Sequence, residues 1–134
     1  MEPMSVNDLV ADARTRIRGL SMEEAQREFE SGEAVIVDIR DVRERWREGA
    51  IPGSKHVPRG MLEFWVDPES KYHKPVFAAD KQFVFFCAAG QRSALATQCA
   101  QRMGLNPVAH IAGGFTAWKA AGGPVEMPES RSKA

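Results

Sequence analysis

The stretch FVFFCAAGQRSALATQ, residues 83–98, joins a run of bulky apolar residues to a short segment of small residues and a helix start. Its first four residues are typical of a buried strand, and the residues from Ser93 onward are typical of a helix. A thiol, Cys87, and a cation, Arg92, lie between the two. In α/β proteins, ligands collect beyond the carboxyl ends of the parallel strands. The stretch therefore predicts an α/β fold in which Cys87 stands at such an end.

Strands and helices alternate along the rest of the chain. Short apolar or β-branched runs predict further strands at residues 34–39, 55–57 and 108–111. Helical spacing, capping patterns and terminal glycines predict helices at residues 6–17, 21–32, 41–49, 93–103 and 115–122, and a helical turn at 61–66. Parallel strands need crossover connections that cover both faces of their sheet. We therefore expect a parallel sheet between two layers of helices.

The composition is that of one globular domain. The chain has 134 residues, of which 43% are hydrophobic and 27% charged, and its 18 basic residues balance its 18 acidic ones. A balanced charge offers no general attraction for nucleic acid or an anionic membrane. The N-terminal residues resemble no secretory signal, and the longest apolar run is far shorter than a membrane helix of ~20 residues. We expect a cytoplasmic protein with neither nucleic acid nor membrane as a partner.

Cysteine and histidine usage bears on the kind of site. The two cysteines and three dispersed histidines form neither a disulfide framework nor a spaced zinc cluster. We therefore expect no metal and no organic cofactor, and we interpret Cys87 as a working thiol. Cys99 shares one helical face with Leu95 and Met103, which favours a packing role over that of a resolving thiol.

The residues around Cys87 suit an ionised sulfur. A thiolate is the reactive form of cysteine, and the pKa of a thiol falls from ~8.5 toward ~3.5–7.5 near a helix N-terminus or a cation. If residues 88–91 curl around the sulfur, their N–H groups form a nest, and Gly90 permits the close turn. Arg92 adds a planar fork of donors suited to a tetrahedral oxyanion such as thiosulfate or phosphate. This chemistry requires a sulfur that is charged and open to solvent. The alternative is that Cys87 is only the buried end of a strand.

Three ordered segments carry a resemblance to a known family. They are VIVDIRDVRERWREGAIPGSKHVP, FVFFCAAGQRSA and AGGFTAWKAAGGPVE, and they span most of the chain. Together they resemble the signatures of the rhodanese, or sulfurtransferase, family. The resemblance implies a rhodanese-like three-layer α/β/α domain with a central parallel sheet of about five strands, at residues 21–126. A helical extension at residues 1–20 would precede it, and a flexible tail at residues 127–134 would follow. The sequence departs from the family at Ala50, where histidine is frequent.

The resemblance also implies a thiosulfate sulfurtransferase-like enzyme with a double-displacement mechanism. Cys87 would take a sulfane sulfur from thiosulfate or a persulfide, and would pass it to cyanide or a thiol; a protein could serve as donor or acceptor. The substrate-binding residues implied are Ala88, Ala89, Gly90, Gln91, Arg92 and Ser93, with Arg92 on the sulfonate end of the donor. The alternatives are a non-enzymatic persulfide carrier or binding module and, less favoured, a phosphatase or arsenate reductase. Those two enzymes have loops one residue longer than the six residues from Cys87 to Arg92.

Three further residues are candidates for support or for the rim of the pocket. Asp38 ends a predicted strand and would either orient the loop or form a structural ion pair with an arginine. Arg59 and Trp65 lie in the long connection before the strand that ends at Cys87, a place where loops can border a pocket. Each of these two residues is more often a surface or packing residue than a substrate contact.

Overall fold

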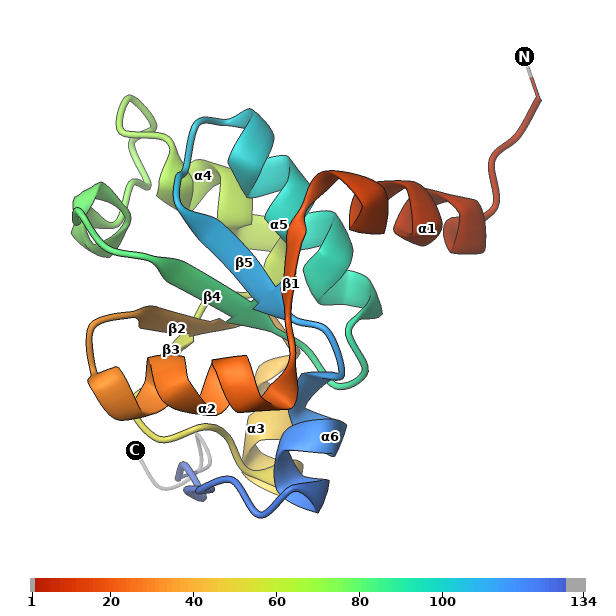
Figure 1. The fold of residues 1–134 in the computed structure, drawn as a ribbon. Coiled ribbons are helices and arrows are strands. Elements are labelled where there is room, and N and C mark those ends of the chain that lie inside the picture. Colours follow the sequence, from red (N-terminus) through yellow and green to blue (C-terminus); the bar gives the residue numbers. More distant parts are fainter. Residues whose placement is uncertain (1, 130–134) are drawn as a thin grey trace.

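The computed structural model describes residues 2–129 and shows one five-stranded parallel sheet covered by helices (Figure 1). The strands follow the order β1-β5-β4-β2-β3 across the sheet. They are β1 Arg18–Leu20, β2 Val35–Asp38, β3 Lys55–His56, β4 Phe83–Phe86 and β5 Val108–Ile111. The helices are α1 Val6–Arg16, α2 Met22–Ser31, α3 Val42–Glu48, α4 Leu62–Val66, α5 Gln91–Arg102 and α6 Gly114–Ala120, with short 3₁₀ helices η1 Arg59–Met61 and η2 Pro75–Ala78.

The sheet separates two hydrophobic layers, which confirms the expected three-layer α/β/α architecture. Successive side chains of a strand point to opposite faces. Phe83, Phe85 and Cys87 accordingly pack with residues of α4 and α5. Val84 and Phe86 pack on the other face with residues of α2 and α6. Figure 1 shows α4 and α5 on one side of the sheet and α2, α3 and α6 on the other. Burial on both faces explains why the central strands are almost continuously apolar.

The first strand, β1, was not predicted. Its three residues, Arg18–Leu20, pair in parallel with β5 at the edge of the sheet. A strand this short that contains glycine shows no alternation that could reveal it. The segment expected to be a helical extension, residues 1–20, therefore contains both a helix and an edge strand. Helix α1 packs against α5 through Val10 and Ala13, which contact Ala94.

Helix boundaries follow the capping residues. Ser21 and Glu24 form the predicted capping box of α2, and Gly32 ends that helix with a φ of 69°. Asp41 caps α3 as expected. Helix α5 begins at Gln91, two residues before the predicted start.

Residues 130–134 of the predicted tail lie outside the described part of the chain. Within residues 2–129, every helix is too short or too polar to cross a membrane.

Candidate active site: the Cys87 loop

Cys87 directly follows the central strand β4, and two backbone amides donate to its sulfur. The N–H groups of Gly90 and Ser93 donate hydrogen bonds to Cys87 Sγ at 3.2 Å and 3.3 Å. The Ser93 amide belongs to the first turn of α5, so the positive end of that helix also faces the sulfur. Amide donors and a helix N-terminus both favour a negatively charged sulfur.

A buried hydroxyl and imidazole extend this set of contacts. Cys87 Sγ lies 3.5 Å from Ser93 Oγ, which is 2.8 Å from His110 Nδ1 on β5. All three residues are buried. Burial, together with the nearby positive charge of Arg14, lowers the pKa of His110 to about 4. The imidazole is therefore neutral at physiological pH and links Ser93 to the sheet.

Helix α6 holds the carbonyl side of the loop. Its first amides, those of Phe115 and Thr116, donate to the carbonyl oxygens of Cys87 and Ala88 at 2.8 Å and 3.0 Å. This arrangement turns the loop carbonyls toward α6. The amides of Gly90 and Ser93 remain available to the sulfur.

Gly90 is required at its place by two constraints. Its φ is 89°, a left-handed conformation that residues with a Cβ rarely adopt. A Cβ atom there would also overlap the carbonyl oxygen of Ala112. Only glycine meets both constraints, so the sharp turn predicted for this loop depends on Gly90.

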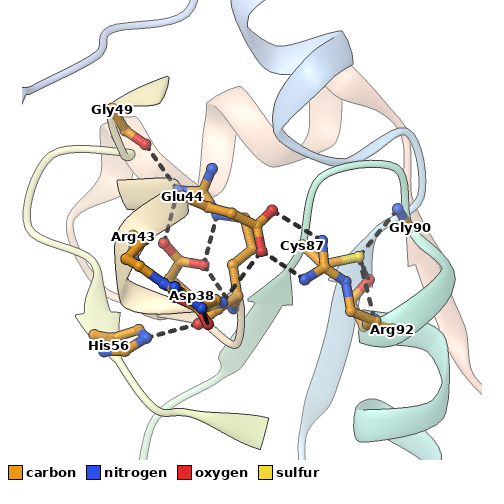
Figure 2. Close-up of polar contacts among 11 residues, drawn as sticks. Asp38, Arg43, Glu44, Gly49, His56, Cys87, Gly90 and Arg92 are labelled. Atoms are coloured by element: carbon orange, nitrogen blue, oxygen red, sulfur yellow. Dashed lines mark hydrogen bonds and ion pairs between the residues drawn. The ribbon is translucent and has the colours of Figure 1, made fainter. Parts of the chain in front are cut away.

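Arg92 does not present a free fork of donors. Its Nη1 and Nη2 atoms donate to Glu44 Oε1 and Oε2 at 2.7 Å and 3.1 Å (Figure 2). The Arg92 side chain is 45% exposed and that of Glu44 is 19% exposed. The hydrogen bond from Arg92 is the main reason why the pKa of Glu44 lies below its ordinary value. The guanidinium predicted to hold a donor anion thus holds a carboxylate of the protein itself.

Asp38 forms a structural ion pair, one of the two roles expected for it. Its fully buried carboxylate accepts hydrogen bonds from Arg40 Nε and Nη2 at 2.9 Å and 2.8 Å. Arg45 Nη1, on α3, donates to it at 2.9 Å. Figure 2 shows Asp38 among the side chains that lie beside α3. Asp38 therefore anchors the helix that carries Glu44.

The structure places Arg59 and Trp65 away from the sulfur contacts. Arg59 Nη1 donates to Glu63 at 2.8 Å, and the other oxygen of Glu63 lies 3.4 Å from Cys99 Sγ. Burial is the main cause of a raised pKa for the Cys99 thiol. Trp65 packs against the core, and the Lys74 ammonium lies over its ring, 4.9 Å from the ring centre.

A cleft of about 430 Å³ borders the loop. Its lining residues are Arg40, Glu44, Arg47, Glu48, Ala88, Phe115, Thr116 and Lys119. Cys87 is only 1% exposed, which differs from the accessible thiol that its proposed chemistry requires. Its neighbour Ala88 lines the cleft, whereas Cys87 itself is not part of the lining.

Sequence reasoning missed two residues of this site. Glu44 stands three residues after the helix-capping Asp41, a position typical of a capping box, but its pairing with Arg92 spans 48 residues. His110 is one of the three dispersed histidines, which show no metal-ligand spacing, so the sequence did not connect it with the Cys87 loop. Its contact with Ser93 depends on the pairing of β4 with β5, which aligns Phe85 with His110.

Fold and site together define an α/β protein with a short loop, from Cys87 to Arg92, at the carboxyl end of its central strand. A family model for the rhodanese-like domain matches residues 21–121. The mouse protein "Thiosulfate sulfurtransferase/rhodanese-like domain-containing protein 3" is 30% identical over 106 residues, which are 75% of this chain and 68% of that protein. The chain therefore belongs to the rhodanese-like domain family.

Solved structures agree with this assignment. A human single-domain sulfurtransferase is 30% identical, with a TM-score of 0.63 over 76% of this chain and 95% of that chain. A thiosulfate sulfurtransferase from Pseudomonas aeruginosa is 31% identical, with a TM-score of 0.70 over 92% of this chain but only 22% of that one. A protein of unknown function from Rhodopseudomonas palustris CGA009, described as a possible tyrosine phosphatase, is 53% identical. Its TM-score is 0.90 over 94% of this chain and 97% of that chain.

Proposed function

We propose that this protein is a sulfurtransferase that carries a sulfane sulfur on Cys87. The observation that carries the proposal is the pair of amides, from Gly90 and Ser93, that donate to the sulfur at 3.2 Å and 3.3 Å. The names of the mouse relative and the human structural neighbour support the same class of reaction. Thiosulfate or a persulfide is the donor, and cyanide or a thiol is the acceptor.

The reaction consists of two displacements at sulfur. In the first, the Cys87 thiolate attacks the outer sulfur of thiosulfate; the new S–S bond forms as the old one breaks, and sulfite leaves with the electron pair. In the second, cyanide attacks the outer sulfur of the persulfide, the Cys87–sulfur bond breaks, and thiocyanate leaves while the thiolate is restored. Charge and atoms balance in each step. No oxidant or reductant is required.

The surroundings of the sulfur suit both steps. Cys87 is the leaving group of the second step, and the two amide donors stabilise the negative charge that returns to it. The Cys87 thiol donates to Ser93 Oγ at 3.5 Å. Once the thiol is ionised, the Ser93 hydroxyl can turn its own proton toward the sulfur as a third donor. Because Cys87 is only 1% exposed, the donor reaches the sulfur only when neighbouring side chains move. Arg92 and Glu44, whose pair joins α5 to α3, are the candidates for this movement.

Two other functions follow from specific observations. The Rhodopseudomonas palustris neighbour described as a possible tyrosine phosphatase raises phosphate-ester hydrolysis, since Arg92 also suits a phosphate. The six-residue loop from Cys87 to Arg92 favours sulfur over phosphate. A persulfide carrier without turnover is the second alternative, and the closed position of Cys87 is what favours it.

Steady-state assays separate the three functions. The proposal expects continuous thiocyanate release from thiosulfate or glutathione persulfide with cyanide, and no release by the Cys87→Ser variant. A single stoichiometric discharge would instead indicate a carrier. Hydrolysis of an aryl phosphate that depends on Cys87, in protein that takes up no sulfur, would contradict the proposal and indicate a phosphatase.

A further inference from the structure

Two of the five N–H donors of Arg92 are already engaged, one on each terminal nitrogen, and together they form its end-on fork. Both terminal nitrogens of Arg92 bond to the two oxygens of Glu44, at 2.7 Å and 3.1 Å. A sulfonate would use the same two-point geometry. A donor that carries a sulfonate must therefore compete with a carboxylate held within the same molecule.

The Glu44 carboxylate is held in position by its own helix. It occupies the third helical position of α3, and its Oε1 also accepts the Asp41 amide at 3.2 Å. Helix α3 is tied to the sheet by the buried pair of Arg45 with Asp38. The carboxylate therefore does not have to be ordered anew each time it pairs with Arg92.

Glu44 is the member of the ion pair that lines the cleft. Glu44 lines the cleft together with Ala88 of the loop, whereas Arg92 is absent from its lining. A ligand inside the cleft therefore contacts Glu44, whereas the guanidinium of Arg92, which is 45% exposed, is reached from outside the cleft. Because the lining also holds Arg40, Arg47 and Lys119, Glu44 opposes thiosulfate by occupying Arg92 and not by making the cleft negative.

We propose that Glu44 is a specificity-determining residue, one that selects against thiosulfate and in favour of thiol persulfides. A thiol persulfide offers its outer sulfur to Cys87 without any group that must take both donors of Arg92. Thiosulfate carries a sulfonate and has to displace Glu44 to take the end-on fork of Arg92. This inference rests on the proposed sulfurtransferase function and adds the class of donor.

The test compares two donors in matched variants. Glu44→Gln keeps an acceptor for the Asp41 amide, so the helix cap survives while the charge is removed. We expect this change to raise kcat/KM for thiosulfate about tenfold and to alter kcat/KM for glutathione persulfide less than about twofold. Glu63→Gln serves as control, because Glu63 also pairs with an arginine at 2.8 Å but lies outside the cleft lining. It should leave both values unchanged.

A double-mutant cycle assigns the effect to Arg92. In an Arg92→Ala background, Glu44→Gln should change thiosulfate efficiency less than about twofold, because the contested donors are gone. An unchanged ratio of thiosulfate to persulfide efficiency in Glu44→Gln would overturn the inference. A gain of the same size in the Arg92→Ala background would overturn it as well.

Binding without chemistry separates this inference from the proposed function. Calorimetry with thiosulfate compares the Cys87→Ser variant with the Cys87→Ser/Glu44→Gln double variant, neither of which can take up sulfur at residue 87. Tighter binding by the double variant supports the inference even where the wild-type protein transfers no sulfur, and equal or weaker binding overturns it. Failure of wild-type protein to accept sulfur from either donor contradicts the proposed function alone.

Discussion

Ser93 Oγ lies 2.8 Å from His110 Nδ1 and 3.5 Å from the sulfur of Cys87, so a single hydroxyl joins the loop thiol to a buried imidazole. A neutral imidazole carries one ring nitrogen that donates and one that accepts. When Nδ1 carries the proton, it donates to Ser93 Oγ, and the hydroxyl proton is free to turn toward the sulfur. His110 then acts through Ser93 as a positioning residue.

Removal of the Ser93 hydroxyl should slow the alkylation of Cys87 without unfolding the loop. Ser93→Ala keeps the backbone amide at 3.3 Å from Sγ but removes the third donor. We expect alkylation of Cys87 by iodoacetamide at pH 7 to slow about tenfold, because the thiolate loses a hydrogen bond. The measurement is the alkylation rate as a function of pH.

Thr97→Val is the matched control for that variant. Thr97 is also a buried hydroxyl residue of α5, and its Oγ1 has no hydrogen-bond partner within residues 2–129. Its replacement should leave the alkylation rate unchanged. An equal loss of rate in both variants would contradict the role given to Ser93.

His110 should make the protein less stable in mild acid. The folded state keeps this imidazole neutral down to a pKa of about 4, whereas the unfolded chain binds the proton from its ordinary value of 6.5 downward. The unfolded state therefore binds more protons between these values, and the free energy of unfolding falls as pH falls through this window by roughly 1.4 kcal/mol per unit. Urea unfolding between pH 7 and pH 4 measures the slope. In His110→Gln the slope should be shallower; parallel curves for the two proteins would refute the prediction.

Gly90→Ala should lower the free energy of unfolding by more than the cost of a left-handed backbone conformation alone. A left-handed residue other than glycine costs on the order of 1–3 kcal/mol, and here a Cβ would also overlap the Ala112 carbonyl. Gly122→Ala, at a φ of 81° with nothing near its Cβ position, bears only the conformational cost. Urea unfolding should show a larger loss for Gly90→Ala, and sulfur transfer should be lost in that variant alone. Equal losses of stability would show that the close approach to Ala112 is unimportant.

The Asp38 ion pair should matter far more than an exposed one. Asp38→Asn leaves the buried guanidinium groups of Arg40 and Arg45 without their negative partner, a change that typically costs about 3–5 kcal/mol. Asp12→Asn breaks an exposed pair with Arg16 and should cost less than about 1 kcal/mol. The free energy of unfolding of each variant checks the contrast. A loss below about 1 kcal/mol for Asp38→Asn would mean that α3 is anchored by other contacts.

The predictable parts of the molecule are those whose cause is local. Strand β4 and the capping of α2 follow from neighbouring residues, so both were found in the sequence. Strand β1 was missed because its three residues gain their structure from pairing with β5, which is distant in the chain.

The same distinction holds at the site. The small residues and Gly90 after Cys87 predicted a tight loop in which the amides of residues 88–91 face the sulfur. Of these, the Gly90 amide donates to Cys87 Sγ, and the second donor is the Ser93 amide of α5. The pairing of Glu44 with Arg92 and the contact of Ser93 with His110 were not predictable, because they join separate elements across the carboxyl edge of the sheet. The burial of Cys87 also depends on tertiary packing, since the loop lies against the first turn of α6.

The most direct test is the intact mass of the protein after incubation with glutathione persulfide or thiosulfate, followed by peptide mapping. If Cys87 carries sulfane sulfur, the protein should become heavier by one sulfur atom on Cys87 and should return to its original mass when cyanide is added. The Cys99→Ser variant should gain the sulfur, and Cys87→Ser should not. A protein that gains no sulfur, or gains it on Cys99 and not on Cys87, would contradict the account.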